Sequence, residues 1–158
     1  MTRPHRPYNP GVRLSRPQER MVYVLAAGLW LSGLLWLLFE HYVRMEADFG
    51  PERHWLQPWW LKLHGALALL GVWGFGVLWS FHIRRAWGLH RHRLSGGSLF
   101  TVVTWLALSG LLLYYTGNET LRSWISLLHW LVGLASAVAI GVHVAVAPQR
   151  SGRAPDAP

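Results

Sequence analysis

The sequence predicts an all-α integral membrane protein, built as a bundle of four transmembrane helices. Of its 158 residues, 52% are apolar and only 14% are charged. The charged residues lie mostly outside four apolar segments, each close to the roughly 20 residues that cross a bilayer as a helix. Several of the eleven tryptophans flank these segments, where a helix meets the lipid headgroups, namely Trp55, Trp59, Trp60, Trp87 and Trp124.

The first helix is expected at about 21–40. It is too long for a secretory signal and has no small-residue cleavage site, so we expect it to be retained as a membrane helix. The preceding residues 1–20 are rich in proline and arginine, which predicts a largely disordered basic tail. The remaining helices are expected at about 60–83, 98–116 and 121–146. They complete a helical domain 21–146 that a polar tail, 147–158, follows.

Two connections separate the helices into pairs. The loop 41–59 carries three of the seven acidic residues, Glu46, Asp48 and Glu52, and an Asp-Phe-Gly-Pro turn at 48–51. The connection 84–97 is strongly basic, and Ser95 or Ser98 is a candidate N-cap for the next helix. We recognise no internal repeat beyond the histidines described below.

Charge asymmetry predicts the orientation. Eleven of the fifteen basic residues lie in the two tails and the connection 84–97, and four lie on the other side with five acids. By the positive-inside rule, both termini and the connection 84–97 face the cytoplasm. The net charge of +8 therefore reflects membrane topology, and we expect lipid and no nucleic acid as a partner.

Histidine is the strongest candidate ligand in the chain. The absence of cysteine excludes disulfides, thiolate catalysis, iron–sulfur ligation and covalent haem attachment. His64 and His82 are 18 residues apart in the second predicted helix. At ~100° per residue this spacing places both on one face of a regular helix, ~27 Å apart along its axis. His129 and His143, 14 residues apart in the fourth helix, repeat the arrangement.

The predicted topology makes the second and fourth helices parallel. His64 and His129 then fall near the outer surface, and His82 and His143 near the cytoplasmic one. Two such helices can hold two stacked haems, each between one histidine from either helix. The two spacings differ by four residues, or ~6 Å, so the helices must tilt differently. The alternative for each histidine is a hydrogen bond to a neighbouring helix or an aqueous cavity, although buried ionisable residues in membranes are costly and usually functional.

Basic residues near the histidines are candidate partners for haem propionates. On the cytoplasmic side these are Arg84, Arg85 and Arg93, and on the outer side Lys62 and Arg122. They also serve as topology determinants. His41, beside Glu40 at the outer end of the first helix, could replace a ligand or join a proton path to a quinone, and its role stays open.

These features resemble the di-haem core of membrane b-type cytochromes, in which two parallel helices each contribute one ligand to each of two haems. Three segments resemble bacterial cytochrome b561-like proteins: LKLHGALALL, HRLSGGSLFTVVTWLALSGLLLYYTG and LLHWLVGLASAVAIGVHV. The resemblance covers about residues 55–146. The b561 type also takes a ligand from its first helix, and here that helix has no histidine within its apolar segment, so no quinone-site residues are carried over.

The resemblance implies a multi-pass protein of the bacterial inner membrane with two non-covalent b haems. It implies an electron-transfer subunit of an oxidoreductase complex, between the quinone pool and a periplasmic cytochrome or iron–sulfur protein. Because the soluble loops are short, we expect the electron donor or acceptor to be another chain. We expect this partner to dock on the loop 41–59. Two alternatives are a pigment-binding subunit, since Ala139 and His143 resemble an Ala-x-x-x-His bacteriochlorophyll ligand pattern, and a purely structural membrane anchor.

Overall fold

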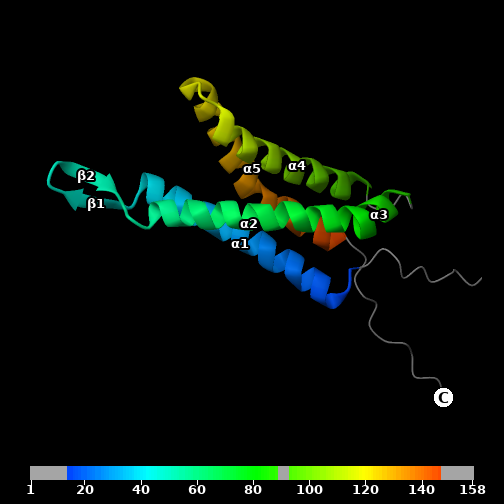
Figure 1. The fold of residues 1–158 in the computed structure, drawn as a ribbon. Coiled ribbons are helices and arrows are strands. Elements are labelled where there is room, and N and C mark those ends of the chain that lie inside the picture. Colours follow the sequence, from blue (N-terminus) through cyan, green and yellow to red (C-terminus); the bar gives the residue numbers. More distant parts are fainter. Residues whose placement is uncertain (1–13, 89–92, 147–158) are drawn as a thin grey trace, which may run out of the picture. The chain divides into compact units, whose positions relative to one another are not determined.

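The protein is all-α in its membrane part, as predicted. A computed structural model describes residues 14–88 and 93–146 (Figure 1). Within them, four helical stretches are long and apolar enough to cross a membrane: Arg16–His41, Gln57–Gly88, Leu94–Tyr115 and Glu119–Ala145. At most 6% of each apolar window is buried inside the protein, so most of these side chains face outward, as lipid contact requires.

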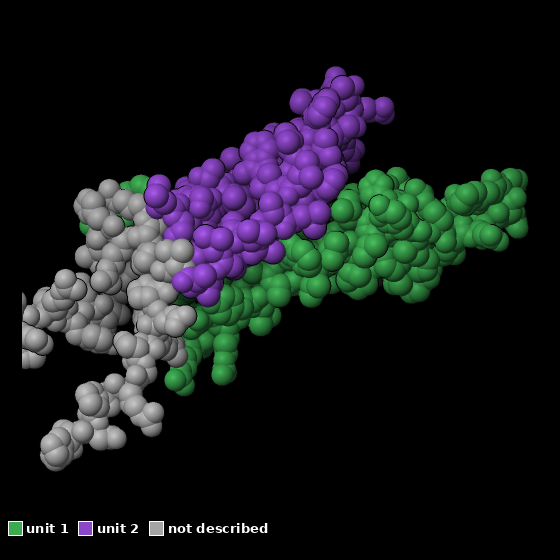
Figure 2. All heavy atoms as spheres, turned by 180° about the vertical axis from the view of Figure 1, so that it is seen from behind, with its two compact units in different colours: residues 1–91 green, residues 92–158 purple. Residues whose placement is uncertain are grey.

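The chain divides into two compact units, residues 1–91 and 92–158 (Figure 2). Helices α1 (Arg16–His41) and α2 (Gln57–Leu78) pack together in the first unit, and α4 (Arg93–Tyr115) and α5 (Glu119–Val146) pack together in the second. Each unit is therefore an antiparallel pair of helices. The tails 1–13 and 147–158 lie outside the described residues.

Helix α1 begins at Arg16, five residues earlier than expected. The cause is a cap: Gln18 Oε1 accepts a hydrogen bond from the backbone N–H of Ser15 at 2.9 Å, and a proline occupies the first turn. The polar residues at 16–20 thus form a first helical turn, where the composition of the segment had predicted a disordered tail.

A β-hairpin replaces the irregular loop expected between the first two helices. Strands β1 (Arg44–Ala47) and β2 (Gly50–Arg53) pair antiparallel, with Arg44 opposite Arg53 and Ala47 opposite Gly50. The connection is the predicted turn, and Gly50 adopts a φ of 116°, a conformation that glycine tolerates best. Figure 1 shows the hairpin extending beyond the ends of α1 and α2.

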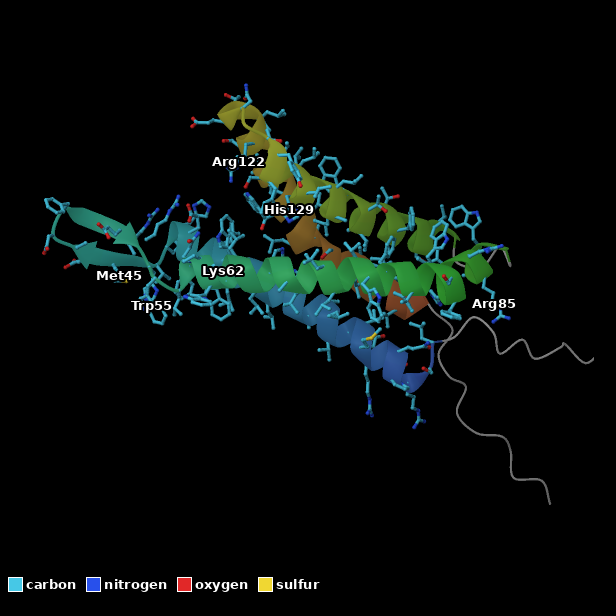
Figure 3. All side chains as sticks on the ribbon, in the orientation of Figure 1. Met45, Trp55, Lys62, Arg85, Arg122 and His129 are labelled. Atoms are coloured by element: carbon cyan, nitrogen blue, oxygen red, sulfur yellow. The ribbon has the colours of Figure 1, made fainter. Side chains whose placement is uncertain are left out.

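Helix α2 continues into a π-helical turn, η2 (Trp79–Ile83), and a short helix α3 (Arg84–Gly88). The backbone N–H of Arg84 donates to the carbonyl of Trp79, five residues earlier. A π-turn is wider than an α-turn, and such turns occur often at functional sites. Lys62 and Arg85, labelled in Figure 3, lie toward opposite ends of this long helix.

In the second unit, α4 begins at Arg93, so neither Ser95 nor Ser98 is its N-cap. Ser98 instead donates from within the helix to the carbonyl of Ser95. Helix α5 begins at Glu119, where the Asn118 side chain accepts a hydrogen bond from the Leu121 backbone N–H at 2.9 Å. Both helices end within one residue of the expected positions.

Candidate functional site

The His64 ring lies in the contact between α1 and α2. Its Nδ1 is 3.0 Å from Ser32 Oγ and 3.1 Å from the carbonyl oxygen of Leu29, both on α1. Ser32 is only 2% exposed. A Cβ at Gly33 would lie 3.1 Å from the ring, so a larger residue would require the imidazole to shift by a few tenths of an ångström. A Ser-Gly step on α1 thus forms a seat for His64.

These contacts determine which nitrogen of His64 carries the proton. A carbonyl oxygen can only accept a hydrogen bond, so the contact with Leu29 requires a proton on Nδ1. The Ser32 hydroxyl donates to the same carbonyl at 3.1 Å and is left to accept from Nδ1. In the neutral imidazole the lone pair is then on Nε2, the nitrogen that a metal ion would bind.

The second unit repeats this arrangement at His129, which is labelled in Figure 3. Its Nδ1 is 2.8 Å from Ser109 Oγ, and Ser109 is fully buried. The Ser109 hydroxyl has one proton, and its 2.7 Å contact with the carbonyl of Trp105 uses it. When Ser109 donates to this carbonyl, it accepts from Nδ1–H of His129. A Cβ at Gly110 would lie 3.4 Å from the ring.

The two seats share a sequence signal that the analysis of the sequence missed. The segment Leu-Ser-Gly-Leu-Leu occurs at 31–35 and again, unchanged, at 108–112. The conclusion that the chain has no repeat beyond its histidines is therefore wrong. Each copy lies on the first helix of its unit and holds a histidine of the second helix.

His143 lies against a third Ser-Gly step, Ser95-Gly96. A Cβ at Gly96 would be 3.8 Å from its ring. The two Ser-Gly steps of α4 are 14 residues apart, as are His129 and His143 on α5. In an antiparallel helix pair, equal spacings on the two helices place Ser109-Gly110 opposite His129 and Ser95-Gly96 opposite His143. A single register of α4 against α5 therefore explains both contacts.

His82 lies within the π-turn of η2. The expectation that His82 shares one face with His64 assumed a regular α-helix with ~100° per residue. The π-turn is wider, so this calculation does not hold at His82. His64 and His82 belong to the first unit, and His129 and His143 to the second. The pairing of histidines across the two units stays a prediction.

The candidate propionate partners fall into different environments. The ammonium group of Lys62 lies 4.5 Å from the centre of the Trp59 ring, a cation–π contact. Arg84, Arg85 and Arg122 are exposed on their helices. The side chain of Arg93 lies outside the described residues.

Glu40 joins three segments at the hairpin end of the first unit. Its carboxylate accepts from Arg53 of β2 and from Gln57 of α2, each at 2.9 Å. His41 is exposed, with its ring against Tyr42. Glu40 therefore fixes the base of the hairpin to both helices, a structural role that the sequence did not indicate.

Comparison of the chain with protein-family models, with curated proteins and with solved structures found no match. Among the described residues, no three histidine, aspartate or glutamate side chains form a metal-binding group. Axial ligation of a haem needs only two imidazoles, each with its lone pair on one nitrogen and its other N–H bonded. His64 and His129 meet that requirement.

Proposed function

We propose that this protein is a membrane-bound b-type cytochrome that holds two haems, each between two histidines, and carries electrons across the bilayer. The observation that carries the proposal is the repeated seat. In each unit the hydroxyl of a buried serine lies within hydrogen-bond distance of Nδ1 of one histidine. With the proton on Nδ1, this contact leaves the lone pair on Nε2. Histidine ligands of metals are typically oriented by such a bond from the other ring nitrogen.

In this proposal His64 and His129 are the axial ligands of the outer haem, and His82 and His143 those of the cytoplasmic haem. A bound haem supplies a one-electron carrier. The chain holds the imidazoles in place, excludes water and, through the bonds to Nδ1, influences the basicity of the ligands. With histidine on both faces of the iron, the proposal requires no chemistry on a small molecule at the metal.

We further propose that the chain is a subunit of a larger redox complex in the inner membrane of a bacterium, with both termini cytoplasmic. Its exchange partners would be the quinone pool and a periplasmic cytochrome or iron–sulfur protein. The hairpin is the proposed docking surface. At its tip Phe49 is 99% exposed, and the same hairpin carries the exposed acidic residues Glu46, Asp48 and Glu52.

The test is a spectrum of the detergent-purified full chain, reduced with dithionite minus oxidised, with haem counted per chain as the pyridine haemochrome. We expect a b-type α-band and two haems per chain. His64→Ala or His129→Ala should remove one haem and leave the other. His41→Ala, at an exposed histidine near the end of α1, is the matched control and should keep both.

The result also separates the alternatives. A colourless chain, isolated under conditions that retain haem in a known membrane cytochrome, would overturn the proposal and favour a structural anchor, in which the Ser–His bonds only join helices. A long-wavelength chlorin band would favour a pigment-binding subunit.

A further inference from the structure

Two buried hydrogen-bond donors in the first unit lack an acceptor. The indole nitrogens of Trp36 on α1 and Trp60 on α2 are inaccessible to solvent and have no hydrogen-bond partner among the described residues. Leaving a buried N–H group unsatisfied typically costs ~1–3 kcal/mol, and native structures contain few such groups. Two of them in one region require an explanation.

Both tryptophans lie in the contact between α1 and α2, next to the His64 seat. Trp36 is four residues after Ser32 and four before Glu40, so the three share one face of α1. On α2, Trp60 lies between Gln57 and His64 with helical spacing.

Two contacts between α1 and α2 flank the tryptophans. Ser32 contacts His64 on one side of them, and Glu40 contacts Gln57 on the other side, toward the hairpin. The ring of Trp60 lies 6.2 Å from that of Phe39, which confirms that Trp60 faces α1. Each indole therefore lies about one helical turn from the Ser32–His64 contact, toward the hairpin.

Other tryptophans at this end of the unit behave differently. Trp55 and Trp59 are well exposed, and Trp59 lies beneath the Lys62 ammonium group. Such exposed indoles can bond lipid headgroups or water, as those of an aromatic belt do. The indole N–H groups of Trp36 and Trp60 are enclosed, so headgroups do not account for them.

We infer that Trp36 and Trp60 form a donor pair for an oxygen acceptor of a bound cofactor, beside the His64 seat. The inference rests on the proposed function and adds a binding site to it. The acceptor chemistry is a carboxylate or carbonyl oxygen, which a haem propionate or a quinone would supply. This site takes the place of Lys62, whose ammonium group is engaged with Trp59.

The experiment uses the full chain and the variants Trp36→Phe and Trp60→Phe, which remove the N–H group and keep an aromatic ring. Trp59→Phe, next to Trp60 but exposed, is the matched control. Each chain is titrated with haem and with haem dimethyl ester, whose propionates are blocked. Each is also titrated calorimetrically with a short-chain quinone, with and without haem.

If the acceptor is a propionate, the wild-type chain and Trp59→Phe will bind haem about tenfold or more tightly than the ester, and the two Phe variants will lose most of that preference. If the acceptor is a quinone carbonyl, haem binding will be unchanged and quinone affinity will fall several-fold in the same two variants. Either result supports the donor pair and identifies its ligand.

The inference is overturned if Trp36→Phe and Trp60→Phe match the wild-type chain in both titrations, or if Trp59→Phe changes as much as they do. This outcome is separate from a failure of the cytochrome proposal. A wild-type chain that binds no haem overturns that proposal, and the quinone titration of the haem-free chain still tests the donor pair.

Discussion

At the residue scale, two serines determine the state of two histidines. Ser32 and Ser109 each donate to a carbonyl of their own helix and accept from a histidine Nδ1 on the facing helix. Hydrogen bonds between membrane helices average only ~0.6 kcal/mol. Loss of either serine hydroxyl should therefore leave the fold intact, which makes these positions suitable for a test of function.

We predict that Ser109→Ala raises the reduction potential of the haem that His129 holds. An acceptor at Nδ1 makes the imidazole a stronger donor to ferric iron, and an outer partner of this kind is worth roughly 10–100-fold in metal affinity. A tenfold loss confined to the ferric state shifts a one-electron potential by about 59 mV. Ser32→Ala should shift it less, because the Leu29 carbonyl remains near Nδ1 of His64. Redox titration of the α-band measures both.

The matched control for this prediction is Ser136→Ala. Ser136 also donates to a carbonyl of its own helix, that of Gly133 at 2.6 Å, and lies on α5 with His129. Among the described residues Ser136 makes no hydrogen bond to a histidine, so the potential should stay at the wild-type value. An equal shift in Ser109→Ala and Ser136→Ala would mean that the helix, and not the bond to His129, sets the potential.

The sequence predicts the histidines better than their seats. Histidines stand out in an apolar segment because ionisable groups are rare there. Serine and glycine are common at any contact between membrane helices, so Ser32 and Ser109 carry little information one at a time. Only the repeat of Leu-Ser-Gly-Leu-Leu at 31–35 and 108–112 distinguishes them, and it becomes informative once each copy is seen opposite a histidine.

At the scale of elements, the hairpin and the π-turn are the two departures from the predicted helices. The strands are four residues each and almost fully exposed, so burial gives them no period-2 pattern to recognise. The π-turn differs from an α-turn only in its hydrogen bonding, for which the sequence WSFHI has no distinctive composition. Several helix ends lie two to five residues from their predicted positions. At these ends the helix is defined by caps and exposed turns and not by apolar residues.

The ion pair at the base of the hairpin gives a second prediction. Glu40→Gln removes the charge that Arg53 contacts at 2.9 Å and keeps the shape of the side chain. Because Arg53 is largely exposed, we expect a loss of no more than about 1 kcal/mol. This corresponds to up to about fivefold more frequent opening of the hairpin base. Limited trypsin digestion after Arg44 and Arg53 should accelerate accordingly.

Glu46→Gln on β1 provides the comparison for the digestion experiment. Glu46 is an exposed carboxylate of the same hairpin, and no ion pair is recorded for it among the described residues. Digestion of this variant should proceed at the wild-type rate. Equal acceleration in both variants would show that cleavage depends on the loss of negative charge in general. It would exclude opening of the base of the hairpin as the cause.

A third prediction concerns the tip of the hairpin. Phe49→Ser removes the most exposed aromatic ring of the described residues and leaves the turn with its glycine in place. We expect unchanged haem content, because the Phe49 side chain is 99% exposed, and slower electron exchange with the native partner in membranes. Phe81→Ser is a control, since it changes an exposed aromatic residue on the π-turn, far along the chain from the hairpin. Unimpaired electron exchange in Phe49→Ser would remove the hairpin tip from the docking surface.

At the scale of the whole molecule, the fold class was predicted from the length of the apolar segments and the positions of the charges. A change at one residue alters neither of them much. Apolar length and the spacing of charge determine how many helices cross a membrane, and the structure has four of sufficient length. Orientation depends on the distribution of arginine, which acts during insertion and leaves no mark on the fold itself. It therefore needs its own experiment.

The fourth prediction is that both termini and the connection after α3 are cytoplasmic. Reporter domains fused after Gly88 or at the C-terminus should fluoresce as green fluorescent protein and be inactive as alkaline phosphatase. A fusion after Gly117, between α4 and α5, should behave in the opposite way. The reverse pattern would invert the assignment of His64 and His129 to the outer side without changing their seats.

The pairing of histidines gives the last prediction. The prediction is that each haem is held by two histidines, one from each unit. In that case His64→Ala and His129→Ala remove the same haem, and His82→Ala and His143→Ala remove the other. The double variant His64→Ala/His129→Ala should then keep one haem per chain, with the potential of the survivor unchanged. The double variant His64→Ala/His143→Ala should keep none, because each haem has lost a ligand.

The pyridine haemochrome and the redox titration separate these cases without knowledge of how the units are placed. One haem retained in His64→Ala/His143→Ala and none in His64→Ala/His129→Ala would reverse the pairing, and with it the predicted parallel course of α2 and α5.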